Sequence, residues 1–189
     1  MTTPHSTTDP TAPASFWGRD GRGDGFRAAT VCRQGHQQAT AYEAYPGKNL
    51  GSCSECGDLV LGECPECGLR IKGRSWAITP RPGQRPTYDE HPNKFCDRCS
   101  VPYPWASDEQ RVRWLLSLLN DLDISDEDRA VVSEHLKQLQ TLAAKDNVRR
   151  ESKLLTEIKK RAPGLFVAGA GKILERLVSD EAWRMVAGG

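Results

Sequence analysis

The chain has 189 residues, of which 38% are apolar and 27% charged, and its formal net charge at pH 7 is +1. These values are ordinary for a soluble protein, and the length suits one domain or two small ones. No apolar stretch is long enough to span a bilayer, which argues against a transmembrane helix.

The first segment, residues 1–25, is rich in Thr, Ser, Pro, Gly and Asp. Such a composition buries too little apolar surface to offset the entropy cost of ordering, so we expect a disordered tail. The tail has no apolar core of the kind that signal peptides carry. Together with a need for reduced thiols, this favours a cytoplasmic location.

All seven cysteines follow in four short clusters between residues 32 and 99. Three clusters are C-x-x-C pairs, and the first supplies one cysteine and a histidine four positions later. Structural zinc is tetrahedral and takes four Cys or His ligands, so seven thiols and one imidazole complete two zinc sites. The candidate ligands are Cys32, His36, Cys53, Cys56, Cys64, Cys67, Cys96 and Cys99.

Other interpretations of the cysteines are weaker. One C-x-x-C pair is also typical of thioredoxin-like redox proteins, but three pairs and a C-x-x-x-H cluster so close together argue against it. A disulfide scaffold leaves one of seven thiols unpaired and is typical of secreted proteins. Iron also accepts cysteine ligands. His91 is an extra imidazole near Cys96, but we expect a turn residue there because Pro92 follows it.

The segments between the clusters favour two zinc ribbons with short hairpins. Residues 37–45 are predicted to form a strand that ends at the turn signal Pro46-Gly47, and residues 69–72 alternate like a strand. In the favoured sequential scheme the first four ligands hold one zinc and the last four hold the other. In the nested scheme the two central C-x-x-C pairs share one metal and the outer clusters share the second.

These residues also carry a family resemblance. Cys-Arg-Gln-Gly-His at 32–36 is followed by two C-x-x-C-G units, then by Phe95-Cys-x-x-Cys99 and Pro-Tyr-Pro-Trp at 102–105. This pattern resembles an uncharacterised bacterial family of cysteine-rich double zinc-ribbon proteins with a helical C-terminal tail. The resemblance covers residues 28–106 well and departs at Ser100, where the family more often has glycine. It implies a fold and a metal but no activity.

A local basic stretch lies between residues 69 and 88. Basic side chains interleaved with aromatic ones suit single-stranded nucleic acid, with cations for phosphates and rings for bases. The alternative is a solvated hairpin with one core tryptophan. The candidate nucleic-acid-binding residues are Arg70, Lys72, Arg74, Trp76, Arg81 and Arg85.

Metal binding changes the overall charge. Seven thiolates subtract seven charges and two Zn²⁺ ions restore four, so the zinc-loaded chain carries a formal charge of −2. Net charge therefore provides no long-range attraction to nucleic acid.

From Ser107 the composition changes to helix formers. Ser107-Asp-Glu-Gln110 is a capping-box pattern that predicts a helix over 108–122, and Ser125 begins a second helix in the same way. A third helix is predicted for about 147–161 and a last one for 165–186. The chain is therefore expected to be α+β, with a disordered tail at 1–25, a double zinc-ribbon domain at 26–106 and a helical domain of about four helices at 107–189.

The favoured function is a non-enzymatic, zinc-binding interaction module. Its ribbons would recognise a macromolecule, and its helices would dock or oligomerise. A protein partner or self-association is favoured because the last helix has a wide apolar stripe; its charges are of mixed sign, which argues against a membrane. The alternatives are a nucleic-acid-binding protein using 69–88 and a thiol-redox protein or metalloenzyme, but a catalytic zinc keeps one position open and here every position can be filled.

Overall fold

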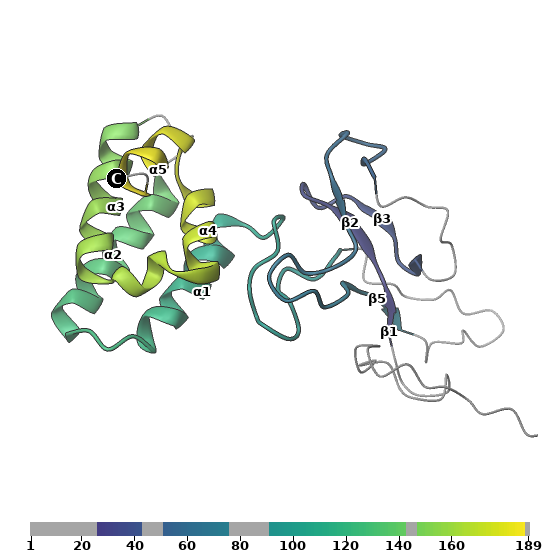
Figure 1. The fold of residues 1–189 in the computed structure, drawn as a ribbon, viewed down its shortest axis with the longest axis horizontal. Helices are drawn as coiled ribbons and strands as arrows, with labels where there is room; N and C mark the ends of the chain where they lie inside the picture. Colours follow the sequence, from purple (N-terminus) through teal and green to yellow (C-terminus); the bar gives the residue numbers. More distant parts are fainter. Residues whose placement is uncertain (1–25, 43–50, 76–90, 143–146, 188–189) are drawn as a thin grey trace, which may run out of the picture. The chain divides into compact units, whose positions relative to one another are not determined.

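The computed structural model describes residues 26–42, 51–75, 91–142 and 147–187. The strands are β1 (Phe26–Ala28), β2 (Thr30–Cys32), β3 (Gln37–Ala39), β4 (Val60–Leu61) and β5 (Lys72–Ser75). The helices are α1 (Asp108–Asn120), α2 (Asp126–Thr141), α3 (Val148–Arg161), the short 3-10 helix η3 (Pro163–Phe166), α4 (Ala168–Leu177) and α5 (Asp180–Ala187). Short antiparallel strands precede an all-helical region (Figure 1), which confirms the predicted α+β class. The tail predicted for 1–25 lies outside the described residues.

The chain divides into two compact units that interleave along the sequence. The first contains the described residues of Met1–Cys32, His36–Gly62 and Arg70–Pro92, and the second those of Arg33–Gly35, Glu63–Leu69 and Asn93–Gly189. The last four cysteines therefore share a unit with the helices. The domain limits at 26–106 and 107–189 follow chain order and remain a prediction.

The first unit contains two small antiparallel sheets. β1 pairs with β5, and β2 lies between β3 and β4. Ile71, just before β5, connects the two sheets: its carbonyl accepts from the Ala29 N–H at 2.7 Å, and its N–H donates to the carbonyl of Gly62, just after β4, at 2.9 Å. A side chain at Gly73 would clash with the backbone carbonyl oxygens of Arg27 and Thr40, so glycine is required where these strands approach each other.

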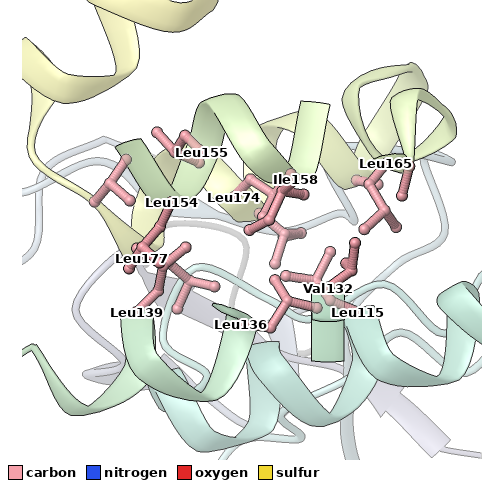
Figure 2. Packing of buried hydrophobic residues seen from close by; sticks show 14 of the residues in the cluster. Leu115, Val132, Leu136, Leu139, Leu154, Leu155, Ile158, Leu165, Leu174 and Leu177 are labelled. Atoms are coloured by element: carbon pink, nitrogen blue, oxygen red, sulfur yellow. The ribbon is translucent and has the colours of Figure 1, made fainter. Parts of the chain in front are cut away.

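The helices of the second unit enclose one apolar core. α1 packs on α2, α2 on α3, α3 on α5 and α1 on α4. Figure 2 shows side chains from α1, α2, α3, η3 and α4 meeting in this core, including Leu115, Leu136, Leu155, Leu165 and Leu174. Apolar side chains at helical spacing produce such a shared face. None of the helices in the described ranges combines the length and hydropathy needed to cross a membrane.

The starts of α1 and α2 agree with the sequence-based prediction, but the last predicted helix does not match the structure. Ser107 and Gln110 form the predicted capping box of α1, and the Ser125 hydroxyl accepts from the Asp128 N–H at the start of α2. The single helix predicted for 165–186 is wrong, because the chain forms η3, α4 and α5 instead. The break before α5 has a local cause: the Ser179 hydroxyl accepts a hydrogen bond from the Ala182 N–H, as an N-cap does.

A buried carboxylate fixes the same break from the other side. Glu151 of α3 is 1% exposed, and its Oε2 accepts hydrogen bonds from the Ser179 N–H at 2.9 Å and from the Ser179 hydroxyl at 2.5 Å. An anion is favourable near the start of a helix, where backbone N–H groups point outward. The start of α5 is therefore set by a side chain distant in sequence.

Candidate metal centres

The eight candidate ligands meet in two groups of four. Cys32, His36, Cys53 and Cys56 form the first set, and Cys64, Cys67, Cys96 and Cys99 form the second set. Within each set the ligand atoms all lie within 4.8 Å of one another. This is the sequential arrangement; the central pairs, Cys53 with Cys56 and Cys64 with Cys67, belong to different sets. His91 is exposed and joins neither set.

The three C-x-x-C knuckles share one backbone geometry. In each, the first cysteine donates its N–H to a carbonyl five residues ahead and accepts from the N–H four residues ahead, with N···O distances of 2.7–3.0 Å. The residue after each pair has a positive φ: 74° at Gly57, 68° at Gly68 and 57° at Ser100. The chain must enter this left-handed region to close the turn, which brings both sulfurs to one side.

The distances between donor atoms fit a tetrahedral metal. Sulfurs at about 2.3 Å from a tetrahedral zinc lie about 3.8 Å apart. The structure has Sγ···Sγ distances of 3.8 Å between Cys32 and Cys56, 3.7 Å between Cys64 and Cys99, and 3.6 Å between Cys67 and Cys96. A disulfide needs about 2.05 Å. The described cysteines are all free thiols, spaced for a shared ion.

The imidazole of the first set is oriented for coordination. His36 Nδ1 lies 3.6 Å from Cys53 Sγ, and His36 Nε2 lies 3.9 Å from a carboxylate oxygen of Glu55. The nitrogen that faces the sulfurs is thus the one placed to bind metal, while a carboxylate lies beside the other nitrogen. Metal-binding histidines commonly have such a carboxylate near the second ring nitrogen.

Sequence reasoning missed Gln38, which links two clusters of the first set. Its side-chain N–H donates to Cys53 Sγ at 3.3 Å, while its Oε1 accepts from the Ser54 N–H at 3.2 Å and from the Ser54 hydroxyl at 2.9 Å. Groups that hydrogen-bond a metal ligand hold it in position and tune its basicity. No spacing pattern signals such a residue, because it depends on how β3 lies against the knuckle.

Two thiols of the first set, Cys53 and Cys56, have pKa values shifted in opposite directions. Burial raises the pKa of Cys53, but backbone hydrogen bonds from Glu55 and Cys56 outweigh burial, so this pKa falls to about 7. A backbone hydrogen bond from Asp58 lowers the pKa of Cys56, but burial and the thiols of Cys53 and Cys32 raise it to about 11. One thiolate therefore forms readily, and its negative charge disfavours ionisation of the neighbouring thiol.

The second set has the same electrostatic pattern. Burial raises the pKa of Cys96, yet hydrogen bonds from the backbone of Cys99 and Arg98 bring it down to about 7. Burial, followed by the Cys96 and Cys99 thiols, raises the pKa of Cys64 to about 12. Metal ligands must be deprotonated, and a divalent cation offsets the mutual repulsion of four thiolates.

Two aromatic residues support the second set. Tyr103 and Trp105 stack with ring centroids 4.7 Å apart, and they are 3% and 8% exposed. The Trp105 indole N–H donates to the Asn93 carbonyl at 2.7 Å, and burial raises the pKa of Tyr103, with Cys96 as the next cause. These rings are packed inside the unit, which favours a structural role over stacking on a ligand.

The candidate nucleic-acid residues are only partly described. Trp76, Arg81 and Arg85 lie outside the described residues, and so does the Arg74 side chain. Lys72 Nζ lies 3.7 Å from the centre of the Phe26 ring, a cation–π contact within the first unit. No surface for nucleic acid can be assembled from the described part of this stretch, so that function stays a prediction.

The comparisons identify one family. The family described as "Uncharacterized protein conserved in bacteria (DUF2321)" matches residues 25–185, which include both ligand sets and nearly all of the helices. Neither a curated protein nor a solved structure matches this chain significantly.

Proposed function

The chain belongs to the bacterial family DUF2321, which confirms the resemblance seen in its sequence, and we propose that it is a zinc-binding interaction module without catalytic activity. The observation that carries the proposal is that each set supplies four donors at tetrahedral spacing. A structural zinc site is closed by four protein ligands, whereas a catalytic site keeps a position for water or substrate.

The donor chemistry supports zinc as the ion. Three thiolates with one imidazole, and four thiolates, are the ligand sets typical of structural zinc. Bound zinc would supply folding free energy to short strands that have little apolar core of their own. The eight candidate ligands would hold the two ions. The knuckles would hold the surrounding loops in a fixed conformation.

The partner we propose is a protein, which includes a second copy of this chain. Val167 and Met185 are large apolar side chains that are 64% and 62% exposed in the helical unit. In sequence, Val167 follows Phe166 and Met185 comes two positions after Trp183, and these two aromatic rings stack with centroids 5.8 Å apart. Large exposed apolar side chains on the helical unit suit a protein contact. We further propose a cytoplasmic location, where thiols stay reduced.

The function is tested by combining thiol chemistry with self-association. Alkylation of the native, zinc-loaded chain should leave all seven thiols unmodified until a chelator is added, because metal-bound thiolates react slowly. Rapid alkylation of one cysteine pair in the zinc-loaded chain would favour the redox alternative instead.

Sedimentation velocity over a concentration series then tests the contact surface. If copies associate, Met185→Asp should weaken association, and Lys160→Asp, which changes an exposed residue on α3, should not. If the wild-type chain stays monomeric, cross-linking in a host extract should depend on Met185 in the same way. Equal cross-linking of wild type and Met185→Asp would contradict this surface.

A further inference from the structure

An unbalanced cluster of arginines lies in the second unit, beside the second set. It begins on α4, where Gly169, Lys172 and Arg176 follow the i, i+3, i+7 spacing of one helix face. A side chain at Gly169 would lie 3.4 Å from Glu66 Oε2, and Lys172 Nζ pairs with Glu66 Oε1 at 2.8 Å. This face of α4 therefore packs against the knuckle that carries Cys64 and Cys67, with Arg176 one turn further along.

The second arginine comes from α1. Arg111 is 13% exposed, forms an ion pair with Asp108, and donates from Nη2 to the Pro104 carbonyl at 2.6 Å. Its Nε–H is buried and has no hydrogen-bond partner among the described residues. A buried donor left without a partner costs free energy, so the hydrogen-bonding capacity of Arg111 is only partly satisfied.

The third arginine comes from the loop Arg33–Gly35, which belongs to the same unit. A side chain at Gly35 would lie 2.9 Å from the Cβ of Trp105. The loop thus lies against the residue that follows Pro104, the hydrogen-bond acceptor of Arg111. Arg33 itself is exposed, and within the described ranges it forms neither a hydrogen bond nor an ion pair.

Like charges dominate around Arg176. Its side chain is half-buried and has no hydrogen bond or ion pair with any described residue. Burial lowers the pKa of Arg176, and the next causes are repulsion from Arg111 and from Arg33; attraction from Glu175 and Glu66 is weaker. Glu66 is already paired with Lys172. The cluster therefore keeps an excess of positive charge, because its four basic side chains outnumber the three nearby carboxylates of Asp108, Glu66 and Glu175.

We propose that Arg33, Arg111 and Arg176 form a binding site for a phosphate group, carried either by a phosphate monoester or by free phosphate. A guanidinium matches phosphate oxygens with two parallel hydrogen bonds and stays charged when partly buried. A phosphate monoester carries about two negative charges at pH 7, which suits three arginines of which only one has an acidic partner. The site does not depend on the identity of the metal, but it requires both sets to be folded, because Arg33 lies between the first-set residues Cys32 and His36.

Isothermal titration of the zinc-loaded full chain tests this site with inorganic phosphate and adenosine monophosphate, in buffer without free zinc. Both ligands should bind saturably, and acetate should bind much more weakly. Arg176→Gln should lower the phosphate affinity about ten- to a hundredfold, as expected for lost hydrogen bonds to a charged group. Lys160→Gln, which removes an exposed cation from α3, should leave the affinity unchanged.

Thermal unfolding separates binding from a structural role. Without phosphate, Arg176→Gln should be at least as stable as the wild type, because the removed charge was repelled by its neighbours. With phosphate, only the wild type and Lys160→Gln should gain stability. Tighter binding of adenosine monophosphate than of inorganic phosphate would identify a nucleotide as the ligand. Equal affinities for the two would identify free phosphate as the ligand. Absence of saturable phosphate binding, or equal binding by Arg176→Gln with two zinc ions retained, would overturn the proposal.

Discussion

Ser100 adopts the same left-handed backbone conformation as Gly68, its counterpart in the other knuckle of the second set, with φ of 57° and 68°. Both residues donate their N–H to the first cysteine of their pair at 2.9 Å. A residue with a Cβ is strained in this region, whereas glycine is not. The second set is therefore closed by one relaxed and one strained turn.

The first prediction follows from this difference. Ser100→Gly should raise the free energy of unfolding of the zinc-loaded chain by about 0.5–1 kcal/mol, since the relief of strain exceeds the entropy that glycine adds to the unfolded state. Gly68→Ala should lower it by roughly 1–2 kcal/mol, although no atom lies within 4 Å of the added Cβ. Chemical denaturation measures both. Destabilisation by Ser100→Gly would show that the serine side chain has a stabilising role that outweighs its strain.

The second prediction concerns Gln38. Gln38→Ala should weaken metal binding at the first set about ten- to a hundredfold, because Cys53 loses its side-chain hydrogen bond and the Cys53–Ser54 turn loses its link to β3. Competition with a chromophoric chelator measures this affinity. Gln37→Ala on the same strand is the control and should have little effect. Identical metal affinities of the Gln38→Ala and Gln37→Ala variants would contradict a role for Gln38 in the metal centre.

The third prediction tests the pairing of clusters. In the sequential arrangement Cys53 and Cys64 belong to different sets, so Cys53→Ser with Cys64→Ser damages both sites and little zinc should remain. In the nested scheme the same double variant damages one site and leaves one ion. The pair Cys53→Ser and Cys56→Ser should retain one ion in either scheme and serves as the control. Metal analysis after gel filtration distinguishes the outcomes.

The fourth prediction concerns chelation. The buried core of the helical unit is built from residues 112–186 and contains no candidate ligand. Removing the metal should therefore abolish the fixed structure of the knuckles and preserve most of the helical circular dichroism. Loss of the helical signal together with the metal would show that α1–α5 require the second set in order to fold.

The sequence predicted the ligands better than it predicted their surroundings. C-x-x-C is a local pattern, and the donor count of eight left no ligand over, so two sets of four were predicted; the sequential grouping was favoured, and the nested one stayed open until the structure brought the ligands together. Gln38 was missed because it meets Ser54 sixteen positions away, and no local pattern in the sequence indicates that contact. Ser100 was noticed as a departure from the family, and its positive φ explains why glycine is usual there.

The helices show the same limit. Serine caps predicted the starts of α1 and α2, because a cap acts within three residues. The break between α4 and α5 was missed because an apolar stripe continues through it: Leu174, Val178 and Ala182 are all buried. The Ser179 hydroxyl separates the two helices by capping α5 locally at the Ala182 N–H, and its contact with Glu151, far away in sequence, reinforces the break.

The central claim is that the chain holds two closed, structural zinc sites. Native mass spectrometry of the full chain, purified without added metal, tests it most directly. The account predicts a mass increase equal to two zinc ions per chain, with all seven cysteines reduced and both ions lost together with knuckle structure on chelation. A single ion, a different metal, or disulfides between these cysteines would contradict it.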